Sequence, residues 1–173
     1  MPPLELTLAI LKPHVIKNPH SLASIRKLIL SSHFKVVQSK RFTFNDEIAK
    51  RFYNEHKDKF FYNRLITFMT SGPSDLYVLA RENAIQEWRN LMGPTKAYKA
   101  QYDDPETIRG QFGLSDTRNA THGSDSAQSA AKEIGLLFPD FDIIKWHDNE
   151  EYYFRSNSLI FCCFDFVHKI NYK

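Results

Sequence analysis

The apolar residues change their spacing several times along the chain, and each change predicts a different element. Residues 4–11 alternate apolar with polar positions and then turn fully apolar before Lys12, which predicts a strand that ends at this lysine. Apolar residues then recur at helical spacing over 21–32, and residues 34–44 are rich in Phe, Val and Thr, as strands are. The first unit is therefore predicted to be a strand, a helix and a second strand.

A second helix is predicted to begin at Asn45, whose side chain can cap free amides ahead of two acidic residues, and to run to about residue 56. Tyr53 lies near the edge of the buried face of this helix, where a hydroxyl can reach outward. From spacing alone, a core position is the more common interpretation of such a tyrosine, and a functional position is the alternative.

Strands and helices keep alternating in the middle of the chain. Residues 76–80 predict a buried strand after a turn at 71–74, and Asn83 is expected to cap a helix that stops at Gly93. This repeated alternation predicts an α/β or α+β sandwich, in which helices cover a sheet.

Residues 95–121 lose any apolar period, which predicts a loop of roughly 25 residues, a length that is usually functional or disordered in a compact domain. Ser124 and Asp125 are then expected to start a helix that continues to about Leu137. His122 would therefore lie directly before a helix N-terminus.

The composition is that of an ordinary globular chain of 173 residues and favours a single domain. A net charge of +3 is too small to favour nucleic acid as the main partner. The only cysteines, Cys162 and Cys163, are adjacent, which favours an intracellular location, cytoplasmic or mitochondrial. No leader is evident, and the longest apolar stretch, 159–167, is far below the ~20 residues of a membrane span, so a soluble protein is expected.

His122 is the residue on which the candidate chemistry centres. Arg109, Arg118 and Asn119 precede it, so an anion site at the helix start is one interpretation and solvated loop charges are the other. The chain has neither of the common glycine-rich phosphate loops, and its seven histidines show no zinc-binding spacing. His122 is therefore a nucleophile, an acid-base group or a bystander.

Several separated segments resemble the nucleoside diphosphate kinase family, from about Leu6 to Trp146. The most specific segment is similar to the family's signature Asn-x-x-His-Gly-Ser-Asp and reads Arg118-Asn119-Ala120-Thr121-His122-Gly123-Ser124-Asp125-Ser126. The chain looks most like the divergent subgroup called nucleoside diphosphate kinase 6. Supporting segments follow in the family's order: Ile10-Leu11-Lys12-Pro13, Met69-Thr70-Ser71-Gly72-Pro73, Met92-Gly93-Pro94-Thr95, Thr107-Ile108-Arg109-Gly110 and Ser129-Ala130-Ala131-Lys132-Glu133-Ile134.

This resemblance implies an α+β fold, namely a ferredoxin-like βαββαβ sandwich with an antiparallel sheet covered by helices. It places the kinase domain at residues 1–147 and leaves 148–173 as a C-terminal extension. Because the extension is apolar, it has two interpretations: a final element packed on the same domain, or a contact surface for another subunit or a protein partner.

The resemblance also implies a reaction. His122 would take the terminal phosphate of a nucleoside triphosphate and pass it to a nucleoside diphosphate in ping-pong fashion, with Glu133 orienting the imidazole. Mg²⁺ is expected to arrive with the nucleotide phosphates. Phe61 would stack on the base and Leu65 would support its other side. Such contacts recognise a flat surface and carry little base identity, so many different bases should be accepted. The nucleotide-binding residues implied are Lys12, Tyr53, Phe61, Leu65, Arg89, Thr95, Arg109 and Asn119.

Two departures from the family concern assembly and turnover. His14 follows Lys12-Pro13 where typical members have an acid, and a short insertion falls within 99–104, in a loop that helps trimer contacts in typical members. A homo-oligomer is still expected, although not the usual hexamer. The alternative to an active kinase is a low-activity or inactive member that serves as a nucleotide-binding or partner-binding subunit.

Overall fold

The computed structural model describes all 173 residues and has a four-stranded antiparallel sheet at its centre. The predicted ferredoxin-like α+β sandwich is confirmed. The strands lie in the spatial order β2-β3-β1-β4, and every neighbouring pair is antiparallel. Their bounds are β1 (Glu5–Leu11), β2 (Lys35–Phe42), β3 (Ser74–Arg81) and β4 (Thr121–Gly123).

Two hydrophobic cores lie on the two faces of this sheet, because successive strand residues point to opposite faces. Leu8 and Ile10 of β1 enter one core, whereas Ala9 and Leu11 enter the other. The central strand β3 divides its side chains in the same way. Both strands are therefore buried on two sides, which explains why their sequences are almost continuously apolar.

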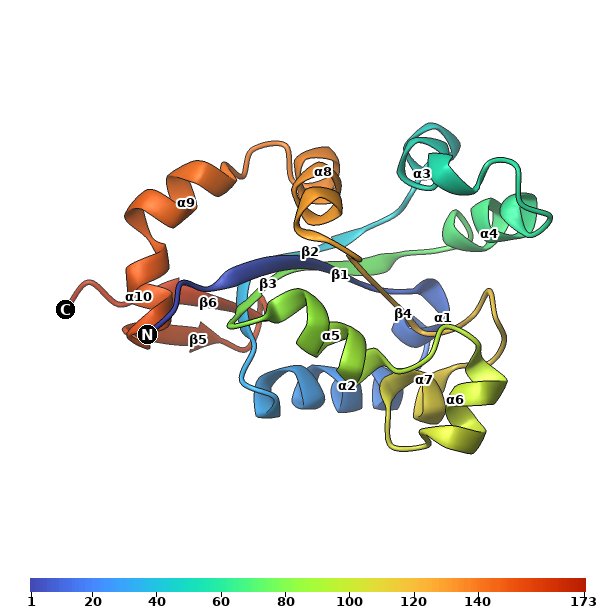
Figure 1. Ribbon diagram of the computed structural model, residues 1–173, viewed down its shortest axis with the longest axis horizontal. Helices are drawn as coiled ribbons and strands as arrows, with labels where there is room; N and C mark the ends of the chain where they lie inside the picture. Colours follow the sequence, from blue (N-terminus) through green and yellow to red (C-terminus); the bar gives the residue numbers. More distant parts are fainter.

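Helices cover both faces of the sheet (Figure 1). One face carries α2 (Pro19–Ser31) and α5 (Ala84–Met92), and the opposite face carries α3 (Asp46–Phe52), α4 (Tyr62–Met69) and α8 (Ala127–Leu137). None of the helices combines the length and the apolar character that a membrane crossing requires.

The remaining elements connect or extend the sandwich. α6 and α7 contradict the long loop predicted for residues 95–121. Among apolar residues, α6 buries only Ala97 and Ala100 and α7 buries only Ile108, so these helices lack the apolar period that marks a helix in sequence. The bounds are α1 (Pro13–Ile16), the 3-10 helix η1 (Asn54–His56), α6 (Ala97–Asp103), α7 (Ile108–Phe112), α9 (Ile143–Asn149), α10 (Glu151–Arg155), β5 (Leu159–Cys162) and β6 (Val167–Ile170).

Two of the predicted helix starts are wrong in their details. Asn83 does precede α5, but it has a left-handed backbone with φ of 52°, and its side chain makes no capping hydrogen bond. α8 is capped by Ser126, whose hydroxyl accepts a backbone N–H of the first turn at 3.0 Å, and not by Ser124 or Asp125. His122 therefore lies on strand β4 and not directly before a helix.

The predicted helix start at Asn45 and the predicted stop at Gly93 are confirmed. The helix that begins after Asn45 is shorter than predicted, because it ends at Phe52 and the 3-10 helix η1 follows in place of its last turn. The Asn45 side chain accepts the backbone N–H of Ile48 at 2.8 Å and so caps α3. Gly93 ends α5 with φ of 82°, a conformation that favours glycine. A Cβ at Gly93 would also lie 2.3 Å from Oγ1 of Thr107, so glycine is required there for space as well.

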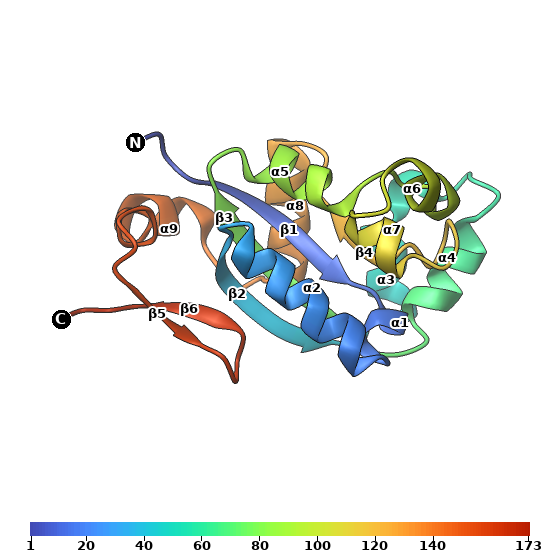
Figure 2. The same ribbon diagram turned by 90° about the horizontal axis from the view of Figure 1, so that it is seen from below.

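The C-terminal extension folds back on the sheet as a β5–β6 hairpin (Figure 2). Phe166, at the turn of this hairpin, is 3% exposed and packs beside Tyr77, with ring centroids 5.1 Å apart. β6 packs against β2, the strand at one edge of the sheet, and Nδ1 of His168 accepts the backbone N–H of Val36 at 2.9 Å. The hairpin therefore covers that edge.

Acid should loosen the hairpin. Burial, followed by the charge of Lys35, lowers the pKa of His168 to about 4, compared with about 6.5 in an unfolded chain. Because only the neutral ring accepts the N–H of Val36, its contribution to stability is complete above about pH 6.5 and is lost as the pH falls toward about 4. We expect the hydrogen-exchange protection factors of the hairpin to fall over this range.

His168→Gln is the matched control for this experiment, because its amide oxygen accepts a hydrogen bond but does not titrate. Its protection factors should change much less over the same range. Parallel losses of protection in the two proteins would contradict the role of His168.

Candidate functional site

One cavity of about 1160 Å³ opens where the end of β1 meets β4. Its walls come from α3, η1, α4, α5, α6, α8 and the segment between α7 and β4. The fold therefore gathers the whole predicted site, whose residues are spread over most of the chain, around one cavity. Its lining includes all ten of them: Lys12, Tyr53, Phe61, Leu65, Arg89, Thr95, Arg109, Asn119, His122 and Glu133.

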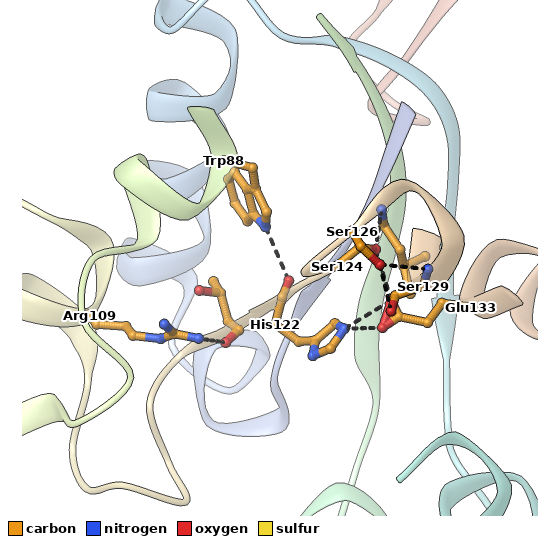
Figure 3. A network of polar contacts seen from close by, with 9 residues as sticks. Trp88, Arg109, His122, Ser124, Ser126, Ser129 and Glu133 are labelled. Carbon is orange, nitrogen blue, oxygen red and sulfur yellow. Dashed lines mark hydrogen bonds and ion pairs between the residues drawn. The ribbon is translucent and has the colours of Figure 1, made fainter. Parts of the chain in front are cut away.

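A chain of hydrogen bonds fixes the ring of His122 (Figure 3). Its Nε2 atom lies 2.9 Å from Oε1 and 3.3 Å from Oε2 of Glu133 on α8. The hydroxyl of Ser124 donates to Oε2 of Glu133 at 2.8 Å and accepts the backbone N–H of Leu8 at 3.2 Å. The carboxylate is therefore bonded to groups on both sides, which fixes its orientation toward the imidazole.

This contact determines which ring nitrogen of His122 is free. A carboxylate only accepts hydrogen bonds, so Nε2 carries the proton and the lone pair lies on Nδ1. The side chain is 23% exposed. Phe52 and Tyr53 flank the ring in edge-to-face contacts, with centroids at 5.0 and 6.5 Å. The imidazole thus presents a nucleophilic nitrogen from a fixed position.

Trp88 on α5 holds the backbone of β4. Its indole N–H donates to the carbonyl oxygen of His122 at 3.1 Å (Figure 3). Its ring also leaves no room for a side chain at Gly123, where a Cβ would lie 2.4 Å from Cδ1 of the indole. Sequence reasoning missed Trp88 because this contact arises from packing between distant elements. Sequence reasoning also missed the hydrogen bond from Ser124 to Glu133, because a serine just before a helix is normally interpreted as the residue that caps the helix N-terminus.

Lys12, at the end of β1, contacts the segment that precedes β4. Its ammonium donates to Oδ1 of Asn119 at 2.7 Å, and the amide nitrogen of Asn119 donates to the carbonyl oxygen of Thr95 at 3.2 Å. Thr95 therefore contributes its backbone to this contact, while its side chain is left free for other contacts. Burial, followed by the charge of Arg109, lowers the pKa of Lys12 to about 7.

Arg109 is also buried, and it bonds only to backbone. Nη1 donates to the carbonyl oxygen of Gly93 at 2.9 Å, Nη2 donates to that of Thr121 at 3.0 Å, and Nε has no partner. Burial, followed by the charge of Arg89, lowers the pKa of Arg109 to about 10. No ion pair includes Lys12, Arg89 or Arg109. Three basic side chains that form no ion pair with a carboxylate give the cavity a site suited to a multiply charged anion.

The wall formed by η1 and α4 is aromatic. Phe61 lies against His56, with ring centroids 5.6 Å apart, and Leu65 follows one helical turn later. Tyr53 is 5% exposed, so the core interpretation holds for its ring, yet its buried hydroxyl has no hydrogen-bond partner. Burial, followed by the charge of Glu133, raises the pKa of this hydroxyl, which keeps it protonated and able to donate.

The family described as nucleoside diphosphate kinase matches residues 5–143 of this chain. One relative, nucleoside diphosphate kinase 6 of Xenopus tropicalis, is 45% identical over 159 residues. This match covers 92% of the chain and 89% of the relative. The resemblance found in the sequence is therefore confirmed, including the likeness to the nucleoside diphosphate kinase 6 subgroup.

Solved structures give the same result. The nucleoside diphosphate kinase of Aquifex aeolicus has a TM-score of 0.75 at 36% identity, covering 82% of this chain and 97% of that one. A halophilic nucleoside diphosphate kinase from Halobacterium salinarum, in complex with CDP, has a TM-score of 0.73 at 32% identity, covering 82% of this chain and 95% of that one. The chain belongs to the nucleoside diphosphate kinase family.

Proposed function

We propose that this protein is an active kinase that transfers the terminal phosphate of a nucleoside triphosphate to a nucleoside diphosphate through a phosphohistidine at His122. The supporting observation is that an unprotonated Nδ1 atom lines the same cavity as three unpaired cations. Phosphoryl transfer by way of the protein requires a nucleophile of this kind together with an anion site.

In the first half-reaction, the lone pair of Nδ1 attacks the γ-phosphorus of the triphosphate. The Nδ1–P bond forms while the bond from phosphorus to the β,γ-bridging oxygen breaks, and the nucleoside diphosphate leaves with that electron pair. The proton on Nε2 stays in its hydrogen bond to Glu133, whose carboxylate stabilises the positive charge that develops on the ring. In the second half-reaction, a terminal phosphate oxygen of another diphosphate attacks the phosphohistidine and reverses these steps.

Lys12, Arg89 and Arg109 would stabilise the charge that spreads over the phosphate oxygens in the transition state. The unpartnered hydroxyl of Tyr53 supplies a further donor within the same cavity. A metal ion held only by protein ligands would be repelled by these cations, whereas Mg²⁺ bound to phosphate oxygens and water brings its own counter-charge. The substrate is therefore proposed to be the magnesium complex of the nucleotide.

The base would stack on Phe61 and contact Leu65, while Thr95 and Asn119 would offer neutral hydrogen bonds to the sugar and phosphates. The Halobacterium salinarum relative was solved with CDP, a nucleoside diphosphate. That complex supports the assignment of the same class of ligand to this cavity.

We assign residues 1–147 to the kinase domain and 148–173 to an extension that packs on it. The end of the family match at residue 143 and the burial of Phe166 support this division. A homo-oligomer, a protein partner for the extension and the compartment stay predictions of the sequence.

Replacing His122 with Gln should abolish the phosphoenzyme, because an amide nitrogen has no available lone pair. Incubation with γ-labelled ATP should give an acid-labile label on the wild type and none on His122→Gln. Turnover should fall by on the order of 10⁴-fold or more. His20→Gln changes an exposed histidine outside the cavity and serves as the control. Equal labelling of wild type and His122→Gln would show that the nucleophile is another residue.

Glu133→Gln should lower kcat by about 10- to 100-fold, because a glutamine amide can donate to Nε2 and so move the ring proton onto Nδ1. Steady-state kinetics should show a much smaller change in KM. Ser124→Ala should have a weaker effect, since it loosens the carboxylate but keeps its charge. Glu47→Gln, on the exposed start of α3, is the control. Wild-type kcat in Glu133→Gln would contradict the orienting role.

Binding of a nucleoside diphosphate at about pH 8 should take up a proton from solution. Lys12 has a pKa of about 7 in the free protein, so it is mostly neutral at this pH, and a nearby phosphate raises its pKa toward the usual 10.4. Calorimetry in buffers of different ionisation enthalpy measures this uptake, which should be absent from Lys12→Met. The idea fails if wild type and Lys12→Met show the same uptake.

A further inference from the structure

The short helix α7 carries Arg109, and it depends on other elements to stay in place. A helix leaves its last carbonyl oxygens without partners inside the helix, and α7 has only five residues. Arg109 in turn bonds to the carbonyl oxygens of Gly93 and of Thr121, the residue before His122. The position of α7 therefore determines where a buried cation of the cavity lies.

Two side chains from other elements contact adjacent carbonyl oxygens at the end of α7. The ring of His14, on α1, has its Nε2 atom 3.3 Å from the carbonyl oxygen of Phe112. The side-chain amide of Gln101, on α6, donates to the carbonyl oxygen of Gly113 at 2.8 Å. A carbonyl oxygen only accepts hydrogen bonds, so Nε2 of His14 carries the proton. The end of α7 is thus bonded both to α1 and to α6.

The start of α7 is held in a different way. The hydroxyl of Thr107 accepts the backbone N–H of Gly110 at 3.2 Å and so caps the helix. α6 also packs closely on α7 (Figure 2), because a Cβ at Gly110 would lie 2.5 Å from the carbonyl oxygen of Asp104, directly after α6. The start is therefore fixed by its cap and by backbone packing, whereas the end relies on His14 and Gln101.

The surroundings of His14 keep its ring neutral. The ring packs against Phe68 of α4, with centroids 5.6 Å apart, and its buried Nδ1 atom has no hydrogen-bond partner. Burial is the main reason that the pKa of His14 is lowered, and the charges of Lys12 and Arg118 lower it further. The neutral ring can still donate from Nε2, whereas a carboxylate at this position would repel the carbonyl oxygen of Phe112.

The segment that leads from α7 to Asn119 begins at the same two carbonyl groups. It forms a closed turn, in which the backbone N–H of Leu114 donates to the carbonyl oxygen of Arg118 at 2.7 Å. The ammonium of Lys12 contacts both the carbonyl oxygen of Thr117, at 3.4 Å, and Oδ1 of Asn119, at 2.7 Å. A shift in the end of α7 would therefore be passed through this turn to Asn119.

We propose that His14 and Gln101 are positioning residues for phosphate binding, which hold the end of α7 so that Arg109 and Asn119 face the nucleotide phosphates together. The inference rests on the proposed function, because it takes Arg109 and Asn119 to bind those phosphates. His14 stands where typical family members have an acid, and Gln101 belongs to the short insertion. The arrangement is therefore a property of this chain.

Calorimetric dissociation constants for the magnesium complex of ADP test this role without requiring turnover. His14→Phe keeps a ring against Phe68 but removes the donor, and Gln101→Met keeps the length of the side chain but removes the donor. Each variant should raise the Kd of ADP by roughly 3- to 10-fold, the usual effect of one lost hydrogen bond. Thermal unfolding verifies that each variant is folded at the temperature of the assay.

Steady-state kinetics separate this role from damage to the reaction centre. KM should rise by a factor similar to that of Kd, whereas kcat should change much less, because Glu133 and Trp88 hold His122 independently of α7. Gln111→Met is the matched control. Gln111 also lies on α7 and donates to the carbonyl oxygen of Glu106 at 2.6 Å, but it is exposed and does not line the cavity. Its loss should leave Kd and KM unchanged.

His14→Gln should retain the wild-type Kd, because a glutamine amide can place an N–H donor where Nε2 of the histidine lies. Combining His14→Phe with Gln101→Met should raise Kd by less than the product of the two single changes, since both act on the end of α7. Wild-type Kd values in both single variants would overturn the inference. The same holds for an equal rise in Gln111→Met or in His14→Gln, and for single changes that multiply in the double variant.

The same measurements distinguish this inference from the proposed function. Raised Kd values in the variants of a protein that binds ADP but transfers no phosphate would support the inference and contradict the kinase. Unchanged Kd values in the variants of an active enzyme would support the kinase and contradict the inference. Absence of nucleotide binding by the wild type would contradict both.

Discussion

The carboxylate of Glu133 connects the parts of the site that must keep a fixed geometry. It belongs to α8, bonds to His122 on β4 and, through the hydroxyl of Ser124, reaches the backbone of Leu8 on β1. β4 has only three residues and pairs with the sheet along one side. So short a strand holds a side chain accurately only if further bonds fix it, and Glu133 and Trp88 supply them from two other elements.

The end of the cavity that holds Lys12 and Arg109, where we propose that the phosphates bind, costs the protein folding free energy when no ligand is bound. Lys12 and Arg109 are both buried, and burial is the main reason that the pKa of each is lowered. The charge of Arg109 lowers the pKa of Lys12 further, and the charge of Arg89 lowers the pKa of Arg109 further. Hydrogen bonds to Asn119 and to backbone carbonyls offset part of the lost hydration. A phosphate chain would relieve the remaining repulsion, so that ligand binding and stabilisation of the fold come from the same interaction.

Much of this could be predicted from the sequence, because β1, β3 and α2 have regular apolar patterns and the His122 segment is distinctive. Other features could not. α6 and α7 bury too few apolar side chains to give a period, and the pattern around Ser124 and Ser126 does not tell which serine caps α8. Contacts made by Trp88 and by the carbonyl of Thr95 depend on where distant elements meet. Local chemistry was therefore easier to predict than tertiary contacts.

The hairpin of β5 and β6 gives the sheet a protected border. An edge strand with free N–H and C=O groups is a template on which other chains can add, in aggregates or in swapped dimers. Here the chain itself covers β2, and Phe166 fills the space beside Tyr77. Loss of the hairpin would expose the backbone of β2 and leave a cavity beside Tyr77, so the same contacts that stabilise the fold also protect the sheet from pairing with another chain.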